Sequence, residues 1–359
     1  MIYIHVPFCR SFCTYCDFYS EIADDRLMDL YVKRLCKEIN DRAGEIDASS
    51  PKTLYFGGGS PSVLSISQLT SILLCLEECG QGGPYEEFTL EANPEDIVEK
   101  GLPYLHNLKT LGVNRLSLGV QSFDDGLLRW MNRRHNAERA EKAFRLAREA
   151  EMDNISLDLI FGFNELSDEL WEKTIDKAVE LAPEHISCYQ LSVEPGSLLA
   201  EMLAEGQWKE APDEVCEKQY LTLCKKLKEA GYRHYEISNF AKPGYEAIHN
   251  CGYWKRCPYV GFGPSAHSFT GRGRSWNSNT LDGYVSSQES LSVEDEKVET
   301  LMLALRTENG VDQDFLYGNC REEDIRAMVE NGSLVKEGRR YRIPEEKFFV
   351  SDRIIRDLI

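Results

Sequence analysis

Residues 2–16 read IYIHVPFCRSFCTYC, a short β-rich run that leads directly into three cysteines. Cys9, Cys13 and Cys16 follow a C-x3-C-x2-C spacing, which can wrap one metal cluster but cannot lie on one helix face. A [4Fe–4S] cluster normally takes four thiolates. Phe18 occupies the nearby position that could supply the fourth. The spacing therefore predicts a cluster with three ligated irons and one iron left open for chemistry.

Two other interpretations of the three cysteines stay open. A disulfide framework needs oxidising surroundings, but no secretory signal precedes Met1 and the apolar opening from Met1 to Val6 is too short for one. Zinc can bind thiolates at this spacing, although a structural zinc site usually adds a second Cys or His pair. We find no such pair in the sequence.

Composition limits the classes of partner. The chain has 359 residues, which suggests about two domains, with barrels as the exception, and 42% of the residues are hydrophobic. Lys and Arg number 41 against 60 Asp and Glu, a net charge of −19. Such an acidic surface repels phosphate backbones and anionic lipids, so we do not expect nucleic acid as a partner. No stretch approaches the roughly 20 apolar residues of a membrane-spanning helix, so membrane association is expected to be peripheral at most.

Cysteine usage indicates a reducing compartment. The chain has twelve cysteines and no signal peptide, which favours a cytoplasmic location. The nine cysteines outside the motif are scattered, and we expect them to sit mostly as small hydrophobic side chains without chemistry. They are Cys36, Cys75, Cys79, Cys188, Cys216, Cys224, Cys251, Cys257 and Cys320.

Short β-rich runs alternate with amphipathic stretches from the first residue to about Gln190. The predicted strands are Ile2 to Val6, Thr53 to Phe56, Phe88 to Glu91, Arg115 to Val120, Ile155 to Phe161 and His185 to Leu191. The predicted helices, several opened by an Asp or Ser N-cap, are Asp24 to Arg42, Ser65 to Glu78, Asp96 to Leu111, Asp125 to Ala150 and Ser167 to Leu181. Alternating units imply an α/β fold with a parallel sheet and helices on its outside. Six units fall short of the eight in a closed barrel, so the pattern predicts an open partial barrel or a doubly wound sheet.

Unusual residues follow the predicted strands at their carboxyl ends, which is the functional side of such folds. The cysteines follow the first strand, and the later segments are Gly57 to Pro61, Glu91 to Pro94, Gln121 to Phe123, and Asp158 with Phe161 and Gly162. Each signal alone is typical of a tight turn or a helix cap. Together they predict one site for a small polar ligand beside the open iron.

The side chains of that site suit an amino-acid zwitterion joined to a nucleoside. The bare backbone of Gly57 to Gly59 lets a ligand's ammonium or carboxylate approach closely. Glu91, Gln121, Arg133 and Asp158 add carboxylates, an amide and a guanidinium. An open iron chelated by an amino acid beside a sulfonium describes S-adenosylmethionine at a radical-generating cluster.

On the basis of these residues, the chain resembles radical S-adenosylmethionine proteins over nearly its whole length. More narrowly, it resembles the group that contains oxygen-independent coproporphyrinogen dehydrogenase and the HemW-type heme chaperones. The resemblance rests on five segments, which are Tyr3 to Cys9, Cys13 to Phe18, Gly57 to Ser62, Leu116 to Phe123 and His249 to Trp254. It implies an open partial (β/α)6 barrel of the radical S-adenosylmethionine type.

The resemblance also implies roles for individual residues. Cys9, Cys13 and Cys16 match the cluster ligands. Residues that match contacts of the iron-bound S-adenosylmethionine are Tyr3, Gly58 and Glu91. Residues that match positions around a second S-adenosylmethionine in the dehydrogenase are Tyr15, Gly59, Ser60, Gln121, Arg133 and Asp158.

Two departures separate this chain from the dehydrogenases within that resemblance. The dehydrogenases carry a further cysteine two positions after the third ligand, where this chain has Phe18. The H-N-x-x-Y-W segment that starts at His249 belongs to the chaperone side. The resemblance therefore implies a protein that binds heme as cargo and delivers it to heme-accepting proteins, with the dehydrogenase as the alternative. Whether the chain is also an enzyme is left open. His249 is a candidate heme ligand or, equally, a packed side chain that orients its loop.

The rest of the chain has a different pattern. A helix is expected from Pro212 to Ala230 and a loop from Tyr259 to Gly273 that could cover the open side of the sheet. Beyond it, a helix from Glu322 to Asn331, a hairpin around Glu337 to Arg339 and a last helix from Asp352 to Ile359 outline a winged helix. We therefore predict a barrel over 1–210, a connecting segment over 211–287 and a small winged-helix-like α+β domain over 288–359. The sequence leaves a homodimer open.

Overall fold

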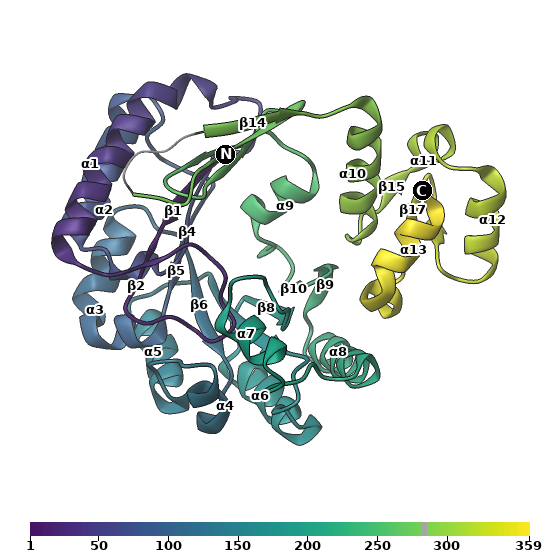
Figure 1. Ribbon diagram of the computed structural model, residues 1–359, viewed down its shortest axis with the longest axis horizontal. Coiled ribbons are helices and arrows are strands. Elements are labelled where there is room, and N and C mark those ends of the chain that lie inside the picture. Colours follow the sequence, from purple (N-terminus) through teal and green to yellow (C-terminus); the bar gives the residue numbers. More distant parts are fainter. Residues whose placement is uncertain (282–285) are drawn as a thin grey trace.

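The computed structural model describes residues 1–281 and 286–359 (Figure 1). Residues 282–285, which fall within the predicted connecting segment 211–287, lie outside the described residues. One mixed sheet of nine strands forms the centre, in the order β11-β1-β4-β5-β6-β7-β8-β10-β9. The fold is therefore α/β, as predicted.

The six predicted strands are confirmed and lie side by side in chain order, all parallel. They are β1 (Ile2–Val6), β4 (Thr53–Gly58), β5 (Glu87–Ala92), β6 (Arg115–Gln121), β7 (Ile155–Phe161) and β8 (His185–Gln190). Helices connect them and cover the outer face of the curved sheet (Figure 1), namely α1 (Asp25–Arg42), α2 (Ile66–Glu78), α3 (Pro94–Thr110), α5 (Ala137–Glu149) and α6 (Asp168–Leu181). The two faces of these strands bury apolar residues such as Ile4, Phe56 and Leu118, because helices pack on one face and the barrel interior lies on the other.

Three further strands extend the sheet beyond the predicted six. At one edge, β11 (Val260–Phe262) pairs in parallel with β1. At the other edge, β10 (Asn239–Ala241) pairs antiparallel with β8, and β9 (Arg233–Glu236) pairs with β10. The prediction of a loop over Tyr259 to Gly273 was therefore wrong: its first part is an edge strand, and β12 (His267–Phe269) and β13 (Gly273–Asn277) form a small antiparallel sheet with β14 (Ser286–Ser290). Among the described residues β11 and β9 do not pair, so the barrel is open.

The predicted helix from Asp125 to Ala150 is also corrected, because the structure divides it. The first part is α4 (Asp125–Trp130), and α5 begins only at Ala137, where Asn136 caps it through Arg139 N. Asn132 between them has a left-handed backbone with φ of 57°. The break places Arg133 in a turn, from which its side chain reaches the inside of the sheet's carboxyl end.

Three helices lie between β8 and β11. They are α7 (Leu198–Ala204), α8 (Asp213–Glu229), which confirms the predicted helix, and α9 (Ile248–Trp254). A disulfide joins Cys36 on α1 to Cys75 on α2. We had expected both as separate small hydrophobic residues, but the two helices pack against each other and bring these side chains face to face.

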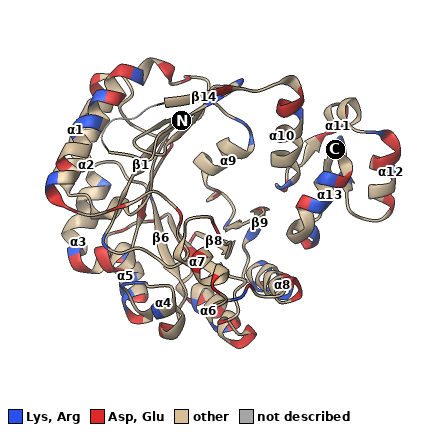
Figure 2. Ribbon diagram, in the orientation of Figure 1, with Lys and Arg blue, Asp and Glu red and all other residues tan. Residues whose placement is uncertain are grey.

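The C-terminal residues form the predicted winged-helix-like unit. Its order is α10 (Val293–Leu305), β15 (Val311–Asp312), α11 (Gln313–Asn319), α12 (Glu322–Glu330), β16 (Val335–Glu337) and β17 (Arg340–Arg342), followed by α13 (Ser351–Leu358). The three strands make one sheet. Figure 2 shows that acidic residues are frequent on α10 and α12, whereas a phosphate-binding face would be basic. None of the described helices combines the length and the apolarity that a membrane span requires.

Candidate cofactor-binding site

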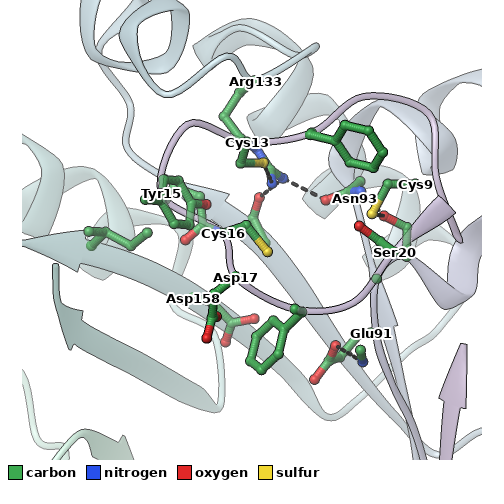
Figure 3. Close-up of a pocket in the computed structure, with 18 of the residues that line it drawn as sticks. Cys9, Cys13, Tyr15, Cys16, Asp17, Ser20, Glu91, Asn93, Arg133 and Asp158 are labelled. Atoms are coloured by element: carbon green, nitrogen blue, oxygen red, sulfur yellow. Dashed lines mark hydrogen bonds between the residues drawn. The ribbon is translucent and has the colours of Figure 1, made fainter. Parts of the chain in front are cut away.

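The carboxyl ends of the parallel strands surround one cavity of about 1280 Å³ (Figure 3). The cysteine loop closes it on one side, and the strand ends form its floor. Of the residues singled out from the sequence, those that line it are Cys9, Cys13, Tyr15, Cys16, Gly58, Gly59, Ser60, Glu91, Gln121, Arg133 and Asp158. Tyr3 and His249 are not among the residues that line the cavity. Residues separated by up to about 150 positions in sequence therefore meet in one site, as the strand-end rule predicts.

The cysteine loop is held at both ends and in its middle. At its ends, β2 (Phe8–Cys9) pairs in parallel with β3 (Glu21–Ile22). In its middle, Thr14 donates from its hydroxyl to the carbonyl oxygen of Trp130 at 2.9 Å, and its own carbonyl accepts from Leu199 N at 2.9 Å. Asn132 donates to the Phe12 carbonyl at 2.7 Å. The turn between α4 and α5 thus supports the loop from behind.

The donor chemistry of the cavity fits an iron–sulfur cluster. Its only Cys or His side chains, among the described residues that line it, are the three cysteines of the motif, and none of them is in a disulfide. Burial raises the pKa of Cys9, and it raises the pKa of Cys16 to about 12, so both thiols stay protonated until a metal offsets the cost of the thiolate. In the described residues no three such side chains are gathered at metal-binding distance. A set of three thiols with no fourth Cys or His suits a cluster better than tetrahedral zinc.

The glycine stretch turns the end of β4 under the cysteine loop. Gly59 N donates to the Val6 carbonyl at 2.9 Å, and Ser60 N donates to the Phe8 carbonyl at 2.7 Å. Gly58 has φ of +105°, and a Cβ there would lie 2.6 Å from the imidazole of His5. From the sequence, we expect these glycines to let a ligand approach the backbone closely. The structure adds a nearer cause, since a side chain at Gly58 would meet His5 before it met any ligand.

Glu91 at the end of β5 is a buried carboxylate beside this turn. It accepts from the Tyr55 hydroxyl at 2.6 Å and from Gly58 N at 3.2 Å. Burial raises the pKa of Glu91 to about 7, against the opposing effect of the hydrogen bond from Tyr55. Tyr3 on β1 lies behind it, with its ring against Gly57 and its hydroxyl hydrogen-bonded to His5 at 3.1 Å. A cation that entered the cavity would lower the pKa of Glu91 and favour its deprotonated, negatively charged form.

Asp158 on β7 is a second carboxylate on the cavity floor. It accepts from the hydroxyl of Ser117 at 3.0 Å and from that of Ser156 at 3.3 Å, and burial raises its pKa. The buried guanidinium of Arg115 also lines the cavity, at the first position of β6. The cavity lining thus carries two carboxyl groups, from Glu91 and Asp158, and the guanidinium of Arg115, which suits a ligand with ammonium and hydroxyl groups.

Arg133 reaches the cysteines from the turn between α4 and α5. Its guanidinium donates to Cys13 Sγ at 3.4 Å, to Asn93 Oδ1 at 2.5 Å and to the Gly119 carbonyl at 2.7 Å (Figure 3). Asn93 in turn donates to Ser60 Oγ at 2.5 Å. Gln121 ends β6 nearby with a left-handed φ of 67°.

His249 lies in the core beneath the cavity. Its side chain is 0% exposed, its Nδ1 is hydrogen-bonded to the Thr53 hydroxyl at 2.8 Å and its Nε2 to the Tyr253 hydroxyl at 2.8 Å. Burial lowers its pKa to about 3, so the imidazole is neutral. Of the two roles considered from the sequence, this arrangement favours packing over heme ligation. Binding to iron would require His249 to break one of these two hydrogen bonds. The next residue, Asn250, is the one that lines the cavity.

Several residues of the site were not singled out from the sequence. Tyr55, Asn93 and Arg115 all line the cavity. Tyr55 could have been found, because it lies two positions before Gly57 and therefore on the same face of the strand. Asn93 was included in the segment Glu91 to Pro94 without a role of its own, and Arg115 was predicted only as the start of a strand.

Comparison with known proteins agrees with this geometry. The family model described as "Radical SAM superfamily" matches residues 3–178. The protein named "Heme chaperone HemW" of Bacillus subtilis (strain 168) is 35% identical over 320 residues, which cover 86% of this chain and 84% of that protein. The protein of the same name from Mycobacterium tuberculosis (strain CDC 1551 / Oshkosh) is 31% identical over 375 residues, covering 100% of this chain and 94% of that protein.

Among solved structures, that described as coproporphyrinogen III oxidase (HemN) from Escherichia coli, a radical SAM enzyme, has a TM-score of 0.80 at 22% identity. The match covers 99% of this chain and 89% of that one, and it shows a shared fold. The fold and the site together define a protein of the radical S-adenosylmethionine class. Within that class, the chain belongs to the family of the heme chaperones HemW.

Proposed function

We propose that this chain is a radical S-adenosylmethionine iron–sulfur protein that binds heme and transfers it to acceptor proteins. The relatives that match it over most of its length are named heme chaperones. The observation that carries the proposal is the single loop that presents three thiols, and among the described residues no fourth, to a cavity lined by Gly58, Gly59 and Glu91.

In this proposal Cys9, Cys13 and Cys16 hold a [4Fe–4S] cluster. When bound, such a cluster supplies an iron without a protein ligand, to which the amino-acid end of S-adenosylmethionine can bind. The backbone at Gly58 and the carboxylate of Glu91 would bind the methionyl end, with Tyr3 behind them. Because its pKa is raised to about 7, the Glu91 carboxyl group can lose its proton at neutral pH and would then balance the ligand's positive charge.

A second S-adenosylmethionine remains part of the proposal. The cavity volume of about 1280 Å³ exceeds the roughly 300–1,000 Å³ of a pocket for one drug-sized ligand. The residues that would contact this second ligand are Tyr15, Gly59, Ser60, Gln121, Arg133 and Asp158, all of which line the same cavity.

Phe18 supports heme handling over dehydrogenase activity. It lines the cavity at the position where the dehydrogenases carry a further cysteine, and 62% of its surface is exposed. An exposed aromatic ring offers a flat apolar surface to a macrocycle but no thiol for redox chemistry. We therefore expect the chain to carry porphyrin iron and not to decarboxylate a porphyrinogen.

The proposal extends to the partners, location and domains of the protein. Its partners would be heme and heme-accepting proteins, with no nucleic acid, at most a peripheral membrane contact and a homodimer as one assembly. The protein would act in the cytoplasm. The division into a barrel over 1–210, a connecting segment over 211–287 and a domain over 288–359 is retained as a proposal.

The decisive experiment offers both substrates to the cluster-loaded protein under anaerobic conditions. Heme uptake is followed by the Soret band, and its release by adding an apo-hemoprotein. In parallel, coproporphyrinogen III is supplied with reductant and S-adenosylmethionine, and protoporphyrinogen is sought by chromatography. We expect heme uptake and release without product, whereas catalytic product formation without heme uptake would overturn the proposal.

A further inference from the structure

Asn93 stands where a helix cap belongs but does not cap. It is the residue immediately before α3, and asparagine is favoured there because its side chain accepts from the helix's free N–H groups. In this structure Asn93 makes no side-chain capping hydrogen bond. Its amide turns instead toward Ser60 and Arg133. Asn93 therefore lacks the usual local capping bond and instead bonds to two residues that are distant in sequence. This arrangement indicates that its side chain has a role in the site.

The chemistry of the partners fixes the direction of these hydrogen bonds. Arginine can only donate, so the oxygen of the Asn93 amide must face Arg133. The amide nitrogen must then face Ser60, whose hydroxyl oxygen accepts its hydrogen. The Ser60 hydroxyl keeps its own hydrogen, which it donates to Cys9 Sγ at 3.6 Å. The chain of donors therefore runs one way, from Arg133 to Cys9.

The same guanidinium also serves a second cysteine. Arg133 donates directly to Cys13 Sγ at 3.4 Å. Two of the three cluster thiols thus receive hydrogen-bond donors from one connected group, and Asn93 is its central member. The residues of this hydrogen-bonded group come from three different strand ends and from a turn. They therefore come together only in the folded barrel.

We propose that Asn93 is a positioning residue, which holds Ser60 and Arg133 as donors to the sulfurs of Cys9 and Cys13 and so raises the reduction potential of the cluster. The proposal rests on the proposed cluster. Hydrogen bonds to sulfur set the potential of such clusters, because they stabilise the form with the additional negative charge. Removing them should make the cluster harder to reduce.

The test is a potentiometric titration of the cluster-loaded protein without S-adenosylmethionine, with dithionite as the reductant and the signal of the reduced cluster followed by electron paramagnetic resonance. Asn93→Asp keeps the shape and still accepts from Arg133. Its second oxygen can only accept, so the Ser60 hydroxyl turns toward it and away from Cys9. Ser60→Ala removes the same donor without adding charge. Asn114→Asp is the matched control, because Asn114 precedes β6 at the opposite end of the sheet and is exposed.

We expect a more negative midpoint potential in Asn93→Asp and in Ser60→Ala, and the wild-type potential in Asn114→Asp. Loss of the cluster from a folded Asn93→Asp protein would also support the positioning role. Wild-type potentials in both Asn93→Asp and Ser60→Ala would overturn this inference and leave the proposed function intact. A wild-type protein that takes up no cluster would instead overturn the proposed function.

Discussion

Replacing Glu91 by Gln should change the pH dependence of stability and weaken cofactor binding at the same time. Burial raises the pKa of Glu91 from 4.5 to about 7. Between these two values the folded protein keeps a proton that the unfolded chain has lost. The free energy of unfolding therefore falls as pH rises through this window, by about 3 kcal/mol for this one group.

Glu91→Gln removes that titration, because the amide does not ionise. The difference in unfolding free energy between the variant and the wild type should then grow by about 3 kcal/mol, in favour of the variant, from pH 4 to pH 8. A constant cost, from placing the Gln amide opposite Gly58 N, does not affect this pH-dependent difference. Urea unfolding of the protein without S-adenosylmethionine, followed by tryptophan fluorescence across the pH range, measures it.

The same variant should bind S-adenosylmethionine about tenfold to 150-fold more weakly at pH 8, from about 1.5 to 3 kcal/mol for a hydrogen bond to a charged group. Glu236 provides a matched control, since burial also raises its pKa to about 7 but it does not line the cavity. Glu236→Gln should reproduce the stability change and leave the affinity at the wild-type value. Parallel pH profiles for wild type and Glu91→Gln, or equal affinities in isothermal titration, would refute the reasoning.

Three further predictions concern the loop, the glycine turn and the core. Alanine at any of the three cluster cysteines should abolish the broad iron–sulfur absorption of anaerobically reconstituted protein, while Cys188→Ala should retain it; stoichiometric zinc without iron would contradict this. Gly58→Ala should lower the free energy of unfolding by more than about 1 kcal/mol, because the φ of +105° and the nearby His5 imidazole both oppose a side chain at this position. A Cβ added at Gly44 would have nothing within 4 Å, so Gly44→Ala should be close to neutral in the same denaturation assay. Tyr253→Phe should cost about 1 kcal/mol of stability through its lost hydrogen bond to His249 and leave the heme spectrum unchanged; an altered Soret band would restore His249 as a heme ligand.

The strands of the barrel could be predicted because each is a short run rich in apolar and β-branched residues, set between amphipathic helical stretches. The edge strand β11 has only three residues, and its partner β1 lies more than 250 positions away, so no local pattern marks it. The break between α4 and α5 was missed because both parts share one amphipathic pattern. Its signals were the left-handed Asn132 and the capping Asn136, which sequence periodicity does not register.

The site was predicted to the extent that it depends on strand ends. Chain order alone places the cysteines, the glycine turn and Glu91 on one edge of the sheet. The direction in which a side chain points depends on packing against distant residues, which local sequence patterns do not contain. The sequence left His249 open between a heme ligand and a packed side chain, and in the structure its hydrogen bonds to Thr53 and Tyr253 hold it in the core. Likewise, the pairing of Cys36 with Cys75 depends on how two helices pack.

The position of β1 in the sheet has a consequence for how the protein is made. The cysteines follow β1 directly, so they leave the ribosome more than 200 residues before β11 does. Yet β1 lies between β4 and β11, and β11 is made only when residues 260–262 appear. Glu38 and Arg42 on α1 also bond to Gly263 and Gly261, at 2.8 and 3.1 Å. The neighbours of β1 are therefore complete only after residues 260–263 have been made, and if the proposed cluster binds here, we expect its assembly to be productive only after that point.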